Sequence, residues 1–99
     1  MSKIVASNLK KNNPQKEIVF EFYAPSAKEV RLAGTFNDWD SSKHVLKKEG
    51  SGTWRLSLAL KSGRYEYRYL VDGNWENDQR PVAFVPNSFG TWNCVVEVV

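Results

Sequence analysis

The feature that most constrains the fold is a repeated alternation of apolar and polar residues in short runs. Alternation with a period of two places successive side chains on opposite faces of a strand, so each run predicts a half-buried β-strand. The runs are EIVFEFY, EVRLAG, TWRLSLAL, YEYRYLV and NCVVEVV, which begin at residues 17, 29, 53, 65 and 93. Clusters of Gly, Pro, Asn, Asp and Ser separate them, and no run has sustained helical spacing. The pattern predicts an all-β fold, an antiparallel β-sandwich.

The length of 99 residues suits one domain with a preceding arm. The stretch from Met1 to Lys16 has little periodicity, and we predict that it is a flexible or loosely docked N-terminal arm. The β-sandwich module is then predicted for residues 17–99. The first residues lack the apolar region of a signal peptide, and no stretch is apolar enough to span a membrane. We therefore expect a cytoplasmic protein without a membrane partner.

Two tryptophans stand in turn-forming sequence that no core requires. Trp39 lies in GTFNDWD, and Trp75 follows Asp72-Gly73, a dipeptide typical of two-residue hairpin turns. If the hairpin closes at this dipeptide, Leu70 pairs with Trp75, and paired residues share one face of a sheet. Both indoles are therefore candidates for a functional surface.

The side chains in phase with Trp75 indicate which face it occupies. Leu70 alternates with the charged Arg68, so this face is predicted to be solvated and Trp75 to stand outside beside Arg68. The same parity places Asn93 opposite Cys94 and predicts an outward amide. An arginine, an amide and an exposed indole are thus expected near one another.

An exposed planar ring beside polar groups suits a ligand with an apolar face and a polar edge. A pyranose has C–H groups that can lie on an indole and hydroxyls that amide and guanidinium groups can bond. A nucleobase is the alternative ligand, since bases also stack on aromatic side chains. The structural alternative is that Trp39 and Trp75 form a hydrophobic lid over one end of the sandwich. The 14 basic and 11 acidic residues give a net charge of only +3, so we do not expect a nucleic-acid partner.

Other conspicuous residues are assigned structural roles. Trp54 is in register with three leucines and is predicted to lie in the core, and Trp92, in phase with Cys94, is predicted to be buried. The segment KHVLKK at residues 43–48 predicts a solvated loop in which His44 has no catalytic or metal-binding partner. Four aspartates lie in turn sequence, where a carboxylate commonly bonds the local backbone: Asp38, Asp40, Asp72 and Asp78. The sequence therefore predicts no catalytic residue, no metal site and no cofactor.

Three segments, taken in order, resemble a known family. They are EVRLAGTFNDWD, GRYEYRYLVDGNW and NSFGTWNCVVEV. They are similar to the glycogen-binding carbohydrate-binding module of family 48, the isoamylase N-terminal or early-set type. Such modules are found in the β subunit of AMP-activated protein kinase and in glycogen branching enzymes. The resemblance implies an immunoglobulin-like β-sandwich that binds α-glucans and has no chemistry of its own.

The resemblance also implies which residues bind carbohydrate: Trp39, Arg68, Trp75, Phe89, Thr91 and Asn93. The two tryptophans match platform positions, and Phe89 matches a side chain, often Leu, that reaches through a cyclic or helical glucan. Arg68 replaces the usual Lys, which keeps the charge but changes the donor geometry. NDQRP replaces the usual Asp-Pro after the second tryptophan, so the family pattern does not define that loop.

Two classes of function follow. The first hypothesis is a non-catalytic module that binds α-1,4-glucans such as glycogen, starch, maltooligosaccharides and cyclodextrins by tryptophan stacking and polar contacts. The alternative is an interaction domain that docks onto a glycogen-metabolising enzyme or kinase, or onto a second copy, without significant glucan binding. An enzyme is rejected, because a glucan-processing barrel takes about 250 residues.

Overall fold

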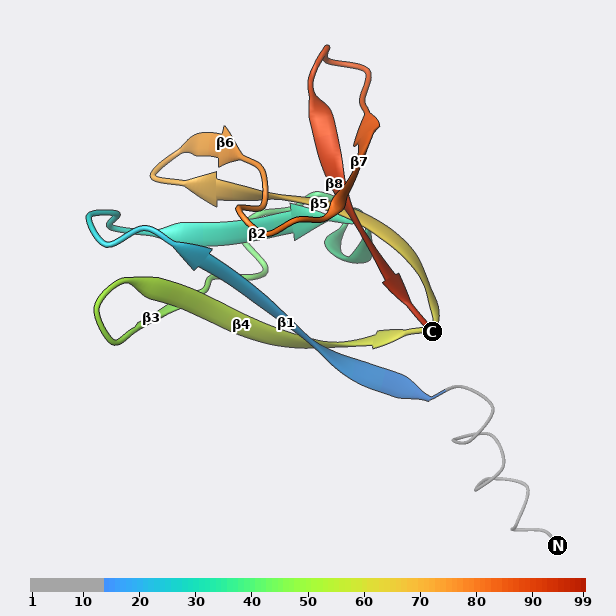
Figure 1. Ribbon diagram of the computed structural model, residues 1–99, viewed down its shortest axis with the longest axis horizontal. Helices are drawn as coiled ribbons and strands as arrows, with labels where there is room; N and C mark the ends of the chain where they lie inside the picture. Colours follow the sequence, from blue (N-terminus) through green and yellow to red (C-terminus); the bar gives the residue numbers. More distant parts are fainter. Residues whose placement is uncertain (1–13) are drawn as a thin grey trace, which may run out of the picture.

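The computed structural model describes residues 14–99, which form two antiparallel β-sheets packed face to face (Figure 1). One sheet has three strands in the order β1-β4-β3, with the bounds β1 Gln15–Tyr23, β4 Thr53–Lys61 and β3 Lys47–Glu49. The other has five strands, in the order β2-β5-β8-β7 with β6 also paired to β5. Its bounds are β2 Val30–Gly34, β5 Gly63–Val71, β6 Asn74–Glu76, β7 Ala83–Pro86 and β8 Trp92–Val98. The predicted all-β sandwich is confirmed.

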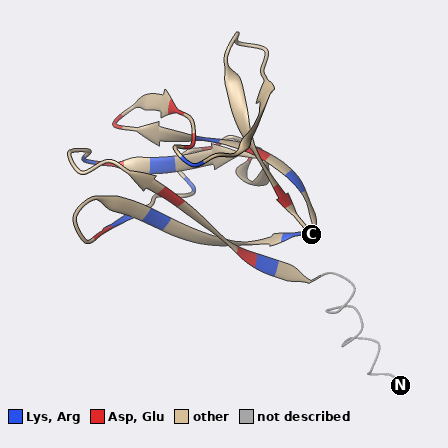
Figure 2. Cartoon of the chain, viewed as in Figure 1, with Lys and Arg blue, Asp and Glu red and all other residues tan. Residues whose placement is uncertain are grey.

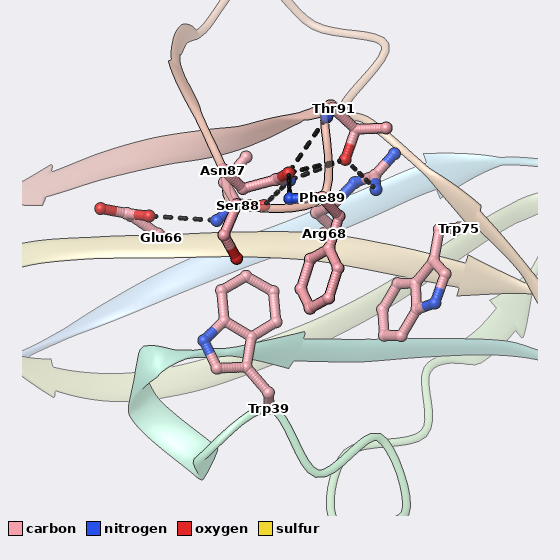
Figure 3. A pocket seen from close by; sticks show the side chains of 9 residues that line it. Trp39, Glu66, Arg68, Trp75, Asn87, Ser88, Phe89 and Thr91 are labelled. Atoms are coloured by element: carbon pink, nitrogen blue, oxygen red, sulfur yellow. Dashed lines mark hydrogen bonds between the residues drawn. The ribbon is translucent and has the colours of Figure 1, made fainter.

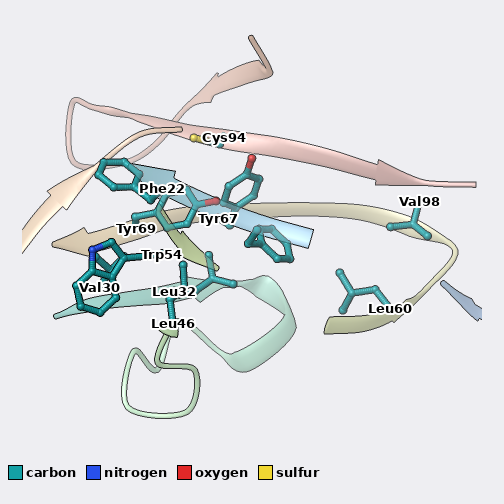
Figure 4. Close-up of a cluster of buried hydrophobic side chains, with 11 residues drawn as sticks. Phe22, Val30, Leu32, Leu46, Trp54, Leu60, Tyr67, Tyr69, Cys94 and Val98 are labelled. Carbon is teal, nitrogen blue, oxygen red and sulfur yellow. The ribbon is translucent and has the colours of Figure 1, made fainter. Parts of the chain in front are cut away.

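The core lies between the two sheets and is built from the inward residues of the alternating strands (Figure 4). Phe20 of β1 meets Tyr67 of β5 edge-on, with ring centroids 5.1 Å apart. Two residues further along the same strands, Phe22 packs against Tyr69 with ring centroids 5.0 Å apart. Aromatic pairs in such orientations contribute about 0.5–1.5 kcal/mol beyond the area they bury. The period-two pattern thus places one aromatic layer from each sheet in contact.

The two remaining tryptophans behave differently from each other. Trp54 is buried as predicted, and its indole N–H donates to the carbonyl of Ala24 at 2.9 Å. Trp92 was predicted to be buried, but 53% of it is exposed. The β7–β8 hairpin projects beyond the three-stranded sheet (Figure 1), and Trp92 is the first residue of β8. Strand parity predicts a face, and only the extent of the opposing sheet decides whether that face is covered.

The β5–β6 hairpin closes at the predicted dipeptide. Asp72 and Gly73 have φ values of 48° and 83°, as a type I′ turn requires. Leu70 pairs with Trp75 and Val71 with Asn74, so the predicted register is confirmed. The hairpin turn therefore sets the face on which Trp75 stands.

The segment at 43–48 is only in part the solvated loop that its lysines predict, since its three lysines are exposed but Leu46 is not. Leu46 is almost fully buried in the core, and residues 47–49 form β3. The carbonyl of His44 accepts the N–H of Leu32, and the N–H of Leu46 donates to Val30, both at 2.9 Å. Pairing with the edge of β2 draws Leu46 inward, a long-range effect that local composition does not reveal.

The loop after β6 is anchored by a buried carboxylate. The Asp78 side chain is fully buried, and its Oδ2 accepts the Tyr67 hydroxyl at 2.6 Å. Its Oδ1 accepts the backbone N–H of Arg80 at 2.9 Å, which is the local bonding predicted for turn aspartates. Burial alone would raise the pKa of Asp78, but the hydrogen bonds from Arg80 and Tyr67 outweigh it and hold the pKa below its usual range. The prediction of an ordinary turn aspartate is thus incomplete, because Asp78 also links the loop to the core.

The N-terminal end of the module lies close to its predicted position. β1 begins at Gln15 and not at the predicted Glu17, so Gln15 and Lys16 belong to the first strand and not to the predicted arm, because both pair with β4. Most of the predicted arm, residues 1–13, lies outside the described residues, so its flexibility stays a prediction. Within residues 14–99, no helix has the length and hydropathy needed to cross a bilayer.

Candidate functional site

The candidate site lies on the outer face of the five-stranded sheet, where two strands share one edge of β5. β8 pairs with β5 along Gly63–Tyr67, and β6 pairs with it along Tyr69–Val71. Arg68 lies at the gap between them. Its Nε donates to Oδ1 of Asn77 at 2.7 Å, just after β6, and its Nη1 to Oγ1 of Thr91 at 3.4 Å, just before β8. Arg68 therefore joins the two segments that flank the gap.

Trp39 reaches the site from a tight turn after β2. The 3₁₀ helix η1, Thr35–Asn37, is followed by Asp38 and Trp39 at φ values of 57° and 59°. This left-handed conformation costs roughly 1–2 kcal/mol per non-glycine residue. The N–H of Trp39 donates to the carbonyl of Gly34 at 2.9 Å and closes the turn. Two consecutive strained residues thus project the indole outward.

Buried Asn37 stabilises this turn. Its Oδ1 accepts the N–H of Gly34 at 3.0 Å, and its Nδ2 donates to the carbonyl of Leu32 at 3.1 Å. The same Nδ2 lies 2.8 Å from Nδ1 of His44, which must accept, so the ring proton is on Nε2. A Cβ on Gly34 would lie 2.5 Å from the carbonyl oxygen of Glu66, so only glycine fits there. Gly34 and Asn37 of the segment GTFNDW therefore hold the turn that positions Trp39.

Three aromatic rings gather on one side of an open pocket (Figure 3). Trp39 is 37% exposed, Trp75 47% and Phe89 88%. Each comes from a different segment: the turn after η1, strand β6 and the β7–β8 loop. The cavity has a volume of about 830 Å³ and is lined by Trp39, Glu66, Arg68, Trp75, Asn87, Ser88, Phe89, Thr91 and Asn93. The structure therefore brings all six predicted site residues together around one pocket.

The opposite side of the pocket is polar. Asn93 has the predicted outward parity, yet only 9% of it is exposed, because neighbouring side chains cover it. Its Oδ1 accepts from Nδ2 of Asn87 at 3.0 Å, and its Nδ2 donates to Oε1 of Glu66 at 3.1 Å. Glu66 also pairs with Arg64 across 3.3 Å. The pocket thus offers a carboxylate, an amide and the guanidinium of Arg68 beside its aromatic rings.

Glu66, Asn87 and Ser88 line the pocket although they were not among the predicted site residues. Glu66 has the same strand parity as Arg68, so parity alone was a sufficient signal. Asn87 and Ser88 lie in a loop whose conformation no periodicity specifies. Their position follows from the β7–β8 hairpin, and β7 was not among the predicted strands.

Charges of both signs are mixed over the fold and are sparse beside the site. Figure 2 shows Lys and Arg interspersed with Asp and Glu over both sheets. The stretch 81–96, which contains β7 and the loop that lines the pocket, has no charged residue. The pocket lining contains one basic and one acidic residue, Arg68 and Glu66. Such a site is suited to a neutral ligand with hydroxyl groups.

An open aromatic platform on a rigid β-sandwich, without a group of three potential metal ligands among residues 14–99, has the features of a binding module. Comparison with known proteins defines the family. The family model described as Carbohydrate-binding module 48 (Isoamylase N-terminal domain) matches residues 7–88. The chain belongs to this family, which confirms the resemblance seen in its motifs.

Individual relatives share the module as a small part of longer chains. Protein FLOURY ENDOSPERM 6, chloroplastic, from Oryza sativa subsp. japonica is 42% identical over 66 residues, 66% of this chain and 12% of that protein. Protein PTST homolog 2, chloroplastic, from Arabidopsis thaliana is 45% identical over 59 residues, 59% of this chain and 11% of that protein. The 1,4-alpha-glucan branching enzyme GlgB of Aquifex aeolicus (strain VF5) is 38% identical over 77 residues, 73% of this chain and 12% of the enzyme. The chain therefore spans about an eighth of these relatives.

Proposed function

We propose that the pocket binds α-1,4-glucans such as glycogen, starch and maltooligosaccharides, with glucose rings stacked on Trp39 and Trp75. The observation that carries this proposal is that two exposed indoles, one from the turn after η1 and one from strand β6, meet on one open pocket whose opposite side is polar. Pyranose C–H faces suit the indoles, and sugar hydroxyls suit the amide, carboxylate and guanidinium groups. The branching enzyme among the relatives acts on 1,4-α-glucan by its name, which supports this ligand class.

Maltoheptaose and β-cyclodextrin should bind with dissociation constants of roughly micromolar to millimolar, because a shallow site of a few stacked rings offers limited contact. Titration followed by tryptophan fluorescence measures this directly, since Trp39 and Trp75 are both exposed in the pocket. Maltohexaose and cellohexaose form the matched pair of ligands, with equal length and the opposite anomeric linkage. The flat cellulose ribbon should bind much more weakly, and equal affinities would contradict the proposal.

The purified chain should release no reducing sugar from glycogen or starch. Hydrolysis of a glycosidic bond uses a pair of carboxyl groups that flank the bond, one of them a general acid. In the pocket, Glu66 is paired with Arg64 and lies opposite no second carboxylate among the lining residues. A reducing-sugar assay on the repurified protein checks this, and turnover that copurifies with the folded chain through several columns would contradict it.

The alternative of a docking domain without glucan binding stays a prediction, as do a glycogen-metabolising enzyme or kinase as partner and a cytoplasmic location. The two plant relatives are chloroplastic by name, which concerns those proteins. Titrations at several salt concentrations distinguish the binding of a neutral glucan from the binding of a charged ligand. Stacking on a neutral sugar changes little with ionic strength, whereas phosphate contacts weaken steeply.

A further inference from the structure

The loop between β7 and β8 carries the most exposed aromatic ring of the pocket. Phe89 is 88% exposed, so side-chain packing does little to hold it. Its position therefore depends on the backbone of residues 87–91. Gly90 adopts a φ of 82°, and the N–H of Asn87 donates to the carbonyl of Thr91 at 2.9 Å, closing the loop at its base.

The Asn87 side chain fills the inside of this loop. Its Oδ1 accepts the backbone N–H groups of Phe89 at 3.0 Å and of Thr91 at 3.1 Å. Its Nδ2 donates to Oγ1 of Thr91 at 2.7 Å and to Oδ1 of Asn93 at 3.0 Å. One amide thus satisfies two backbone donors of the loop and orients two polar side chains of the pocket.

The hydroxyl of Thr91 is turned toward its neighbours in the protein. A threonine hydroxyl donates once and accepts twice. Its oxygen accepts from Nδ2 of Asn87 at 2.7 Å and from Nη1 of Arg68 at 3.4 Å, so protein donors face both acceptor positions, and it lies 3.0 Å from Oδ1 of Asn87. Asn93, by contrast, keeps one N–H beyond its bond to Glu66, and Arg68 keeps terminal N–H groups beyond its bonds to Asn77 and Thr91.

We propose that Asn87 is a positioning residue of the pocket, and that the Thr91 hydroxyl acts through Asn87 and not by contacting the ligand. This inference rests on the proposed glucan-binding function. Asn87 holds Phe89 at the rim of the pocket and directs the Asn93 amide, so that the ligand meets Asn93, Arg68 and the aromatic rings. Thr91 serves as the internal partner that keeps the Asn87 amide in place.

A double-mutant cycle tests the coupling between the two residues. Asn87→Ala and Thr91→Val should each weaken maltoheptaose binding roughly tenfold, as expected for the loss of one or two net hydrogen bonds. The double variant should also lose roughly tenfold, because the second change removes an interaction that is already absent. Asn74→Ala, the same change at an exposed strand position outside the pocket, is the matched control and should bind as wild type does. Losses that multiply to roughly a hundredfold would show that Thr91 contacts the ligand and would overturn the proposal.

A second measurement on the free protein separates this proposal from the proposed function. ¹⁵N order parameters of the Phe89 and Thr91 amides should fall in Asn87→Ala while the melting temperature barely changes. Asn87→Asp keeps an oxygen that can accept the backbone N–H groups of Phe89 and Thr91, but it lacks the Nδ2 donor. Its order parameters should therefore stay as in the wild type, while its affinity for maltoheptaose should fall as in Asn87→Ala. Unchanged order parameters in Asn87→Ala would overturn the positioning role whether or not glucan binds. A wild-type chain that fails to bind maltoheptaose would contradict the proposed function instead.

Discussion

Trp75→Ala is expected to remove most glucan binding while leaving the fold nearly as stable as before. The indole is 47% exposed on the outer face of β6, where Leu70 is its cross-strand partner, so truncation leaves no cavity in the core. Stacking on a sugar should contribute about 1–3 kcal/mol if it resembles stacking on a nucleobase, enough to push a weak ligand beyond measurable range. Maltoheptaose titration and thermal unfolding of the same variant measure the two effects. Trp39→Ala should behave in the same way, because its ring lines the same pocket.

Trp54→Ala is the matched control for this prediction. Trp54 is buried between the sheets, and its indole N–H donates to the carbonyl of Ala24. Truncation should therefore leave a cavity and an unpaired carbonyl and cost roughly 3–5 kcal/mol of unfolding free energy. If Trp75→Ala melted as early as Trp54→Ala, the Trp75 ring would be a structural lid, and the glucan site would lose its platform.

The second large effect is expected on stability, from Asp78→Asn. The buried carboxylate accepts from the Tyr67 hydroxyl and from the backbone and side chain of Arg80. An amide has one acceptor oxygen and a donor nitrogen, so a buried donor is left unpaired and the charge of Arg80 loses its partner. We expect a loss of about 3 kcal/mol in the free energy of unfolding at pH 7, measured by urea denaturation. Asp38→Asn, at an exposed turn position whose left-handed φ asparagine tolerates, should change it little.

The pH dependence of this contribution follows from the lowered pKa of Asp78. A carboxyl group whose folded pKa lies below its unfolded value, near 3.9, stabilises the fold fully above about pH 5. This contribution is lost as the pH falls through the unfolded value toward the folded one. The wild-type chain should therefore lose more stability between pH 5 and pH 3 than Asp78→Asn does. Parallel curves for the two proteins over this range would contradict the assigned role of Asp78.

Local rules account for the parts of the site that the sequence predicts correctly. The Asp72-Gly73 turn sets the register of its hairpin, and the register sets the face of Trp75. Strand alternation places Arg68 on that same face. Both rules involve only residues close together in the sequence, so they can be applied without knowing the tertiary contacts.

The burial of other residues depends on which distant segments pack against them. Trp92 is exposed because the opposing sheet ends before it, and Leu46 is buried because its segment pairs with the edge of β2. Asp78 lies in an ordinary turn sequence, yet it is buried where it accepts the hydroxyl of Tyr67 from the core. None of these outcomes can be derived from a window of neighbouring residues, since each is decided by segments far away in the chain.

The sequence by itself determined strands β1, β2, β4, β5 and β8, the alternation of their faces, the β5–β6 hairpin and the exposure of Trp39 and Trp75. These features follow from backbone geometry, which repeats along the chain and can be derived from residue type and spacing. The tertiary structure decided that the turn after η1, strand β6 and the β7–β8 loop meet on one pocket, and that Asn87 bonds Thr91 and Asn93 there. It did so because strands β6 and β8 share one edge of β5, an arrangement of long-range pairings that no local pattern encodes.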